Sequence, residues 1–258
     1  MIPYFDLHCH LADEQYTPEE VKNILDICQK ENITVCSMST NFEDFEINLK
    51  YSEHPNVLVG FGIHPYEAHK IHKNPKWQEQ IQKTIEEHQQ KIKFLGEVGL
   101  DFYKTKDTLY QQIEVFEYFV YLSQKYNLPL SIHTRSAEKE VCDILAKYQK
   151  QKKLTAIFHC FTSTEKDIVK IILENEWYFG FGGIITFKKS TELIEILKYV
   201  YNNGGNILCE TDSPYITPEP YRGKKNYPYF VKIIYQKIEK ILNTSNFIRT
   251  LPVRNEKL

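Results

Sequence analysis

The chain alternates short apolar runs, rich in β-branched and aromatic residues, with longer segments whose apolar positions recur at helical spacing. The apolar runs begin near eight positions: Tyr4, Thr34, Val57, Phe94, Leu130, Thr155, Tyr178 and Ile207. Neighbouring runs start between 23 residues (Thr34 to Val57) and 37 residues (Val57 to Phe94) apart. Such spacing is typical of repeated strand–helix units and a parallel sheet. Eight units predict an α/β fold, a closed (β/α)8 TIM barrel, although an open doubly wound sheet fits the same count.

The segments between the runs carry helix signals of their own. Thr17-Pro18-Glu19-Glu20 places an N-cap threonine before a proline and two acidic residues in the first helical turn. Asn202-Asn203-Gly204-Gly205 predicts a helix end and a turn just before the last strand. No low-complexity linker divides the sequence. We therefore expect residues 1–258 to form a single domain.

Composition limits the classes of function. Hydrophobic residues make up 42% and charged residues 26% of the chain, which is ordinary for a globular protein. The net charge of −2 gives no global basic surface, so nucleic-acid binding requires a local patch or metal ions. No stretch approaches the ~18 apolar residues of a membrane helix, and the first residues lack the basic and long apolar segments typical of a secretory signal. The six cysteines show no Cys-x-x-Cys spacing. We expect a cytoplasmic protein with reduced thiols, no membrane association and no obligate protein partner.

Ionisable residues gather at the ends of six of the eight predicted strands. These ends read Asp6-Leu7-His8-Cys9-His10, Gly62-Ile63-His64-Pro65, Gly96-Glu97-Val98-Gly99-Leu100-Asp101, Ser131-Ile132-His133-Thr134-Arg135, Ile157-Phe158-His159-Cys160 and Cys209-Glu210-Thr211-Asp212. In a barrel the carboxyl ends of the strands surround one mouth, where active sites form. The pattern predicts an active site built from these side chains.

Three of these residues, His8, His10 and Glu97, are predicted metal ligands. His8 and His10 are two apart on a strand, so both side chains share one face, and Leu7 and Cys9 should face the helix layer. A hydrogen-bonded pair of core histidines is the alternative. Glu97 lies near the end of an apolar strand, where a carboxylate is costly unless an ion or a salt bridge, for example with Arg135, compensates it.

Further candidates complete a binuclear site. His133 and His159, together with Glu97, would form a second site, because a carboxylate with two oxygens can bridge two cations. Asp212 lies at the rim, where it could bind the first ion and accept a proton from water, or merely cap the next segment. Asp101 has no assigned role.

Two residues are candidates for substrate contacts. His64 precedes Pro65 at a strand end and could contact a phosphate. The segment 217–228 is basic, aromatic and rich in turn residues, and Arg222 offers a planar fork suited to phosphate. An ordinary solvated loop is the alternative for this segment.

Together these segments resemble the TatD-like metal-dependent deoxyribonucleases, a branch of the amidohydrolase-type TIM barrels. The resemblance runs over roughly residues 4 to 242 and includes Glu210-Thr211-Asp212-Ser213-Pro214-Tyr215 and the stretch from Arg222 to Pro228. It implies a divalent-metal phosphodiesterase that acts on DNA, with two ions (zinc, manganese or magnesium). By the family pattern, one ion is bound by His8, His10 and Asp212 and the other by His133 and His159, with Glu97 bridging; His64 and Arg222 contact phosphate.

The chain departs from the family pattern at two places. Ser136 stands where many relatives have an acidic residue. The segment 243–258 lacks a clear final helix, and this second departure concerns the packing of the last barrel helix. Two other functions fit the same residues. One is a metal-dependent hydrolase of a small ester, lactone or amide; related enzymes of that kind often bridge their ions with a carboxylated lysine on strand four, where this chain has Glu97. The other is a barrel that binds metal or nucleic acid without turnover.

Overall fold

Eight parallel strands form the central barrel of the computed structural model, which describes residues 4–104 and 106–248. Pairing follows the chain order from β1 to β8. The strands are β1 (Tyr4–Cys9), β2 (Ile33–Ser37), β3 (Val57–Phe61), β4 (Ile92–Asp101), β5 (Leu130–Arg135), β6 (Ala156–Phe158), β7 (Tyr178–Phe181) and β8 (Asn206–Cys209). Each begins within two residues of its predicted start. The predicted (β/α)8 barrel is confirmed.

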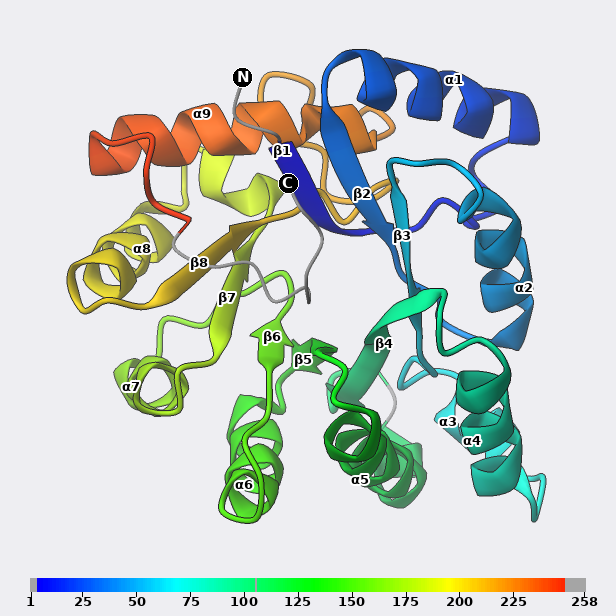
Figure 1. Ribbon diagram of the computed structural model, residues 1–258. Helices are drawn as coiled ribbons and strands as arrows, with labels where there is room; N and C mark the ends of the chain where they lie inside the picture. The colour runs from blue at the N-terminus through cyan, green and yellow to red at the C-terminus, as the bar shows by residue number, and fades with distance from the viewer. Residues whose placement is uncertain (1–3, 105, 249–258) are drawn as a thin grey trace.

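Helices surround the barrel on its outside (Figure 1). They are α1 (Pro18–Lys30), α2 (Phe42–Tyr51), α3 (Ala68–Ile71), α4 (Trp77–Glu87), α5 (Leu109–Tyr126), α6 (Glu138–Gln149), α7 (Lys166–Glu174), α8 (Thr191–Asn202) and α9 (Val231–Leu242), with short 3-10 turns η1 (Lys106–Thr108), η2 (Gly183–Thr186) and η3 (Pro228–Phe230). The predicted cap of α1 is present as a capping box, in which Thr17 accepts from the Glu20 amide and Glu20 accepts from the Thr17 amide. Among the described residues, no helix combines the length and apolar character needed to span a membrane.

The barrel closes between β8 and β1 at the end where the candidate residues lie. The Asp212 amide donates to the His8 carbonyl and the His10 amide to the Ser213 carbonyl, each at 2.8 Å. Deeper in the barrel, the fully buried Asp6 side chain accepts from both the backbone amide and the hydroxyl of Thr211. The seam therefore combines backbone pairing with one buried carboxyl group.

The barrel interior has an apolar layer below a polar one. The apolar layer contains buried residues that lie on strands or just after them: Phe5, Leu7, Cys36, Met38, Leu58, Phe94, Ile157 and Leu208. The expectation that Leu7 faces the helices is therefore wrong, whereas Cys9 does pack with the helix layer. A register shift between Asp6 and Cys9 interrupts the strand alternation, so that Leu7 and His8 both point inward.

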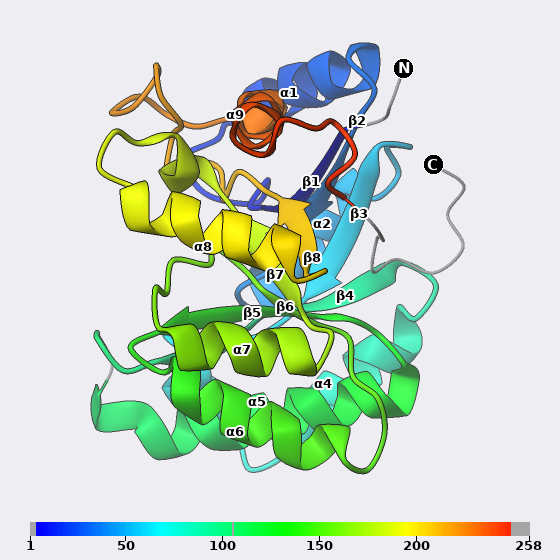
Figure 2. The ribbon, with the colours of Figure 1, turned by 90° about the vertical axis from the view of Figure 1, so that its left-hand side faces the viewer.

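A second register shift lies in β4, between Leu95 and Val98. It lets Phe94 contribute to the apolar layer while Glu97, three residues later, points into the polar layer. Both shifts lie where a strand passes from the apolar layer to the ionisable one. Figure 2, turned by 90°, shows the strands in side view, with α5, α6 and α7 packed against one side and α9 against another.

The last described segment packs against the final helix. The chain leaves α9 through Asn243, which is in the left-handed region with φ 54°. Phe247 is buried, and its ring lies 5.6 Å from that of Tyr235 on α9. Residues 243–248 thus cover the last helix despite the weak pattern there; the rest of the atypical tail, 249–258, lies outside the described residues.

Candidate metal centre

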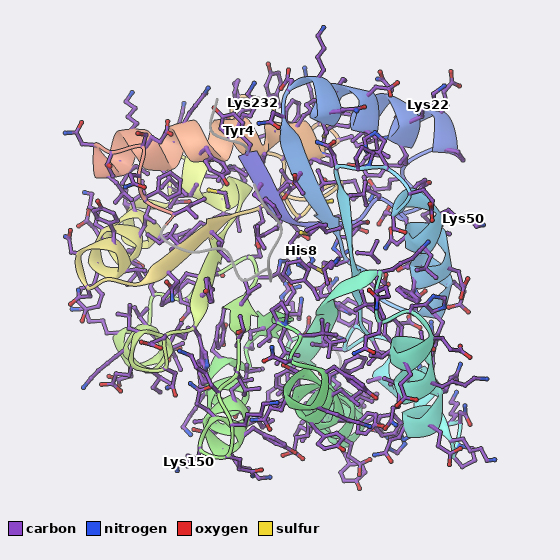
Figure 3. All side chains as sticks on the ribbon, in the orientation of Figure 1. Tyr4, His8, Lys22, Lys50, Lys150 and Lys232 are labelled. Carbon is purple, nitrogen blue, oxygen red and sulfur yellow. The ribbon has the colours of Figure 1, made fainter. Side chains whose placement is uncertain are left out.

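The structure brings all six predicted ligands, and His64, together at the carboxyl ends of the strands. His8 is on β1 and His10 just after it, Glu97 is on β4, His133 on β5, His159 directly after β6, Asp212 after β8, and His64 after β3. Figure 3 labels His8 near the middle of the barrel, whereas the labelled lysines lie around its outside. Most of these side chains are buried, His8 completely and Glu97 to 4% exposure.

Glu97 lies at the centre of the group. Its Oε2 atom is 3.5 Å from both His8 Nε2 and His10 Nε2. Its Oε1 atom is 2.9 Å from His133 Nδ1 and 3.3 Å from His159 Nε2. Each oxygen of one carboxylate therefore faces a different pair of histidines, and Oε1 is also 3.5 Å from His64 Nε2. The alternative partner Arg135 instead places its guanidinium over the Tyr103 ring, 4.2 Å from the centroid.

Asp212 closes the group on the β1 side. Its Oδ1 atom is 3.3 Å from His10 Nε2 and 3.9 Å from His8 Nε2, and its side chain is 13% exposed. Because the Asp212 amide donates a hydrogen bond to the His8 carbonyl, the barrel seam itself fixes this carboxylate beside the two histidines. Asp212 is thus held between a buried pair of imidazoles and the open cavity.

The outward-facing nitrogen of each histidine shows where its proton lies. The second nitrogen of His10 contacts the Met38 carbonyl, which can only accept a hydrogen bond. The second nitrogens of His133 and His159 contact the carboxylates of Asp101 and Glu210, each at 3.2 Å. His8 Nδ1 contacts the Ser131 hydroxyl at 2.8 Å. The carbonyl and carboxylate partners place a proton on the outer nitrogens of His10, His133 and His159, so their inner nitrogens present lone pairs to the centre, as metal-binding imidazoles do. The Ser131 hydroxyl can donate or accept, so His8 can have the same arrangement.

His64 has the opposite arrangement. Its Nδ1 atom accepts a hydrogen bond from the Tyr66 backbone amide at 3.1 Å. A neutral imidazole has one proton, so Nε2, which is 3.5 Å from Glu97 Oε1, carries it. Burial lowers the pKa of His64 to about 3, despite the nearby Glu97, so the ring is neutral at pH 7. His64 therefore presents a hydrogen-bond donor to the centre, although its distances alone would also allow metal binding.

The pKa shifts of the other groups describe paired charges. Burial would raise the pKa of Glu97, but the surrounding histidines hold it well below its usual range. Burial would likewise lower the pKa of His10, yet the bond to Asp212 and the charge of Glu97 raise it to about 9. Burial would also raise the pKa of Asp212, but the hydrogen bond from His10 lowers it, so Glu97 and Asp212 are both ionised at neutral pH. Without a bound ion, protons on the histidines supply the compensating positive charge.

A cavity of about 840 Å³ opens above these groups. It is lined by ligand candidates and by Tyr66, Arg135, Cys160 and Tyr215, among others. Arg222 does not line it. The Arg222 guanidinium stacks on Phe187, 4.1 Å from the ring centroid, in a neighbouring depression of about 430 Å³. The two hollows share Ile184 and Ile216 in their walls.

The partners of the outer nitrogens were not predicted from the sequence. Asp101 received no role and Glu210 was named only as part of its strand-end segment, although the two contact His133 and His159. Alternation along β8 could have indicated Glu210, which is two residues before Asp212. The Met38 carbonyl carries no sequence signal, because every residue has one.

The donor set fits divalent ions. One ligand atom from each of His8, His10 and Glu97 lies within 4.8 Å of the other two. Imidazole nitrogens with carboxylate oxygens suit zinc, manganese and similar metals. Bound cations would offset the buried negative charge of Glu97 and use the inner lone pairs of the histidines. Without cations, the buried histidines must carry extra protons to offset that charge.

The chain is similar in sequence and in fold to several known proteins. Residues 5–248 match a family model described as TatD related DNase. The chain is 31% identical over 257 residues to the uncharacterized metal-dependent hydrolase YabD of Bacillus subtilis, covering 98% of this chain and 97% of that protein. An uncharacterized metal-dependent hydrolase of Mycoplasma pneumoniae is 31% identical over 247 residues, covering 92% and 91% of the two chains. YJJV, a TatD homolog of Escherichia coli, has the same fold, with a TM-score of 0.81 at 20% identity over 96% of this chain and 92% of that one.

Proposed function

The chain belongs to the TatD-related DNase family of metal-dependent hydrolases, and from that premise we propose that it hydrolyses phosphodiester bonds in DNA at a binuclear metal centre. The observation that carries the proposal is the position of Glu97, whose two oxygens each face a different pair of histidines. A carboxylate so placed fits a bridge between two cations.

The residues divide into two sets of ligands. His8, His10 and Asp212 would hold one ion, His133 and His159 the other, and Glu97 both. When bound, such ions activate water at neutral pH and offset the charge of a phosphodiester. The proton on the outer nitrogen of His10, His133 and His159 keeps the inner lone pair of each ring available for this task.

Asp212 and His64 have separate chemical tasks. The Asp212 carboxylate, at the cavity wall, accepts the proton of the attacking water. His64 Nε2–H donates a hydrogen bond to a phosphate oxygen and so stabilises the charge that develops during displacement. One group therefore receives a proton while the other holds one in place.

The two arginines near the mouth bind different parts of the substrate. Arg135 lines the main cavity, where its guanidinium would bind the phosphate that is cleaved. Arg222 lies in the adjoining depression, so its guanidinium contacts a neighbouring phosphate of the same strand. This placement suits an extended nucleic-acid substrate, which occupies more than one hollow.

The test is cleavage of end-labelled oligonucleotides, single- and double-stranded, by metal-stripped protein supplied with Mg²⁺, Mn²⁺ or Zn²⁺. We expect metal-dependent cleavage that Asp212→Asn and Glu97→Ala abolish. Asp143→Asn is a matched control, because Asp143 is an exposed partner of Lys139 and does not line the cavity. Small esters, lactones and amides are assayed in parallel. Hydrolysis of one of these without cleavage of DNA, or full activity of the Asp212 variant, would refute the proposal.

A further inference from the structure

Glu210 is a buried carboxylate that the proposed chemistry does not use. Its side chain is fully buried, and its Oε1 atom accepts hydrogen bonds from the Cys160 backbone amide and from His159 Nδ1, the latter at 3.2 Å. Its Oε2 atom has no hydrogen-bond partner among the residues that the structure describes. A buried carboxylate with a free oxygen is costly, so packing alone does not account for it.

The barrel makes room for this carboxylate at one position. A Cβ atom at Gly180 on β7 would lie 2.5 Å from Glu210 Oε2, closer than atoms can pack. At Gly182, two residues later, a Cβ atom would lie 3.6 Å from the Glu210 carbonyl oxygen, an ordinary contact. The absence of a side chain at residue 180 is thus what admits the Glu210 head group.

Glu210 lies behind His159 relative to the cavity. His159 lines the cavity and directs Nε2 toward Glu97 Oε1 at 3.3 Å, while Glu210 is not among the described residues of the cavity wall. The ring therefore has a carboxylate at each nitrogen, one at the centre and one behind. The Cys160 amide that also binds Glu210 belongs to a residue with φ 46°, so the same carboxylate holds the left-handed turn that follows His159.

We propose that Glu210 is a positioning residue, which holds His159 with its proton on Nδ1 so that Nε2 faces the centre as a metal-binding lone pair. This role rests on the metal centre of the proposed function. A carboxylate bonded to the outer nitrogen fixes the orientation of a ligating imidazole and increases its basicity. Because the two carboxylates lie on opposite edges of the ring, Glu210 acts on metal binding through His159 and makes no contact with substrate.

Three variants test the role. Glu210→Gln keeps the shape of the side chain but removes its charge, and Gly180→Ala places a methyl group against the carboxylate. Gly182→Ala is the matched control, since it adds the same methyl group to the same segment without the collision. Zinc binding is measured on each full-length protein by competition with a chromophoric chelator. We expect the first two variants to keep the wild-type number of zinc ions while the affinity for one falls by about 10- to 100-fold. Gly182→Ala should stay within about twofold of wild type.

A spectroscopic measurement separates positioning from a general loss of stability. In the zinc-loaded protein labelled with 15N-histidine, we expect a downfield, slowly exchanging Nδ1–H proton on His159. This resonance should move upfield and exchange faster in Glu210→Gln and Gly180→Ala, but not in Gly182→Ala.

Three outcomes would overturn the role: an unchanged zinc affinity in Glu210→Gln, an unchanged His159 resonance, or the loss of one whole zinc ion, which would make Glu210 a ligand itself. Neither measurement uses DNA. If both results hold while no oligonucleotide is cleaved, the proposed activity fails and the role of Glu210 stands. If the unaltered chain binds no zinc, both fail together.

Discussion

Replacing His64 tests whether its ring donates a hydrogen bond to the substrate or binds a metal ion. The Tyr66 amide donates to His64 Nδ1 at 3.1 Å, which leaves the proton on Nε2, toward the cavity. His64→Ala should therefore leave the number of bound ions unchanged and remove one donor to the phosphate. Loss of one such donor typically lowers kcat by about 100- to 1,000-fold, equivalent to about 3–4 kcal/mol of transition-state stabilisation. His159→Ala is the comparison. No backbone amide in the described part of the chain donates to the His159 ring, so its inner nitrogen is free to bind metal, and this variant should lose an ion.

The assay pairs metal content by mass spectrometry with kcat and KM on a labelled oligonucleotide. We expect wild-type metal content, a large fall in kcat and a small change in KM for His64→Ala. His64→Gln should recover part of kcat, since its amide can also donate. Loss of an ion in His64→Ala would show that this ring binds metal after all, and the inference from the Tyr66 contact would be wrong.

Four further results are expected. Chelation should lower the melting temperature, since ions at about 100 times their Kd stabilise the fold by about 2.7 kcal/mol; equal melting curves with and without chelator would contradict a metal centre. Asp6→Ala should destabilise the β1–β8 seam by about 1–3 kcal/mol for each Thr211 donor left unpaired, measured by urea unfolding. Phe247→Ala should cost about 3–5 kcal/mol because the ring is buried against Tyr235, whereas a loss below about 1 kcal/mol would mean that this segment does not stabilise the barrel. Arg222→Ala should raise KM for oligonucleotides and leave kcat and metal content unchanged, and a fall in kcat alone would place it at the reacting phosphate.

The architecture and the membership of the site could be predicted from local patterns. Apolar runs, helix signals and their spacing gave the starts of all eight strands, because β and helical periodicities are properties of a few neighbouring residues. Parallel strands in a barrel bring their carboxyl ends together, so the ionisable residues at those ends had to meet. His8, Glu97 and Asp212 were found for that reason, and the structure brings them together.

The orientation of individual groups depended on the folded barrel. Strand alternation placed Leu7 toward the helices, but the register shift in β1 turned it inward. Such a shift arises from the fit between neighbouring strands and has no local pattern. Arg222 was predicted to contact a phosphate, but only the fold shows that its side chain lies in a hollow beside the main cavity.

The sequence by itself determined which residues reach the mouth, and tertiary structure decided which nitrogen of each imidazole carries the proton. His159 and Glu210 are 51 positions apart in the chain. The ring nitrogens of His64 look like those of any other histidine until the Tyr66 amide is seen to donate to one of them. A side chain's position follows from its place on a strand, but its protonation follows from the atoms that surround it, and folding alone brings those atoms into contact.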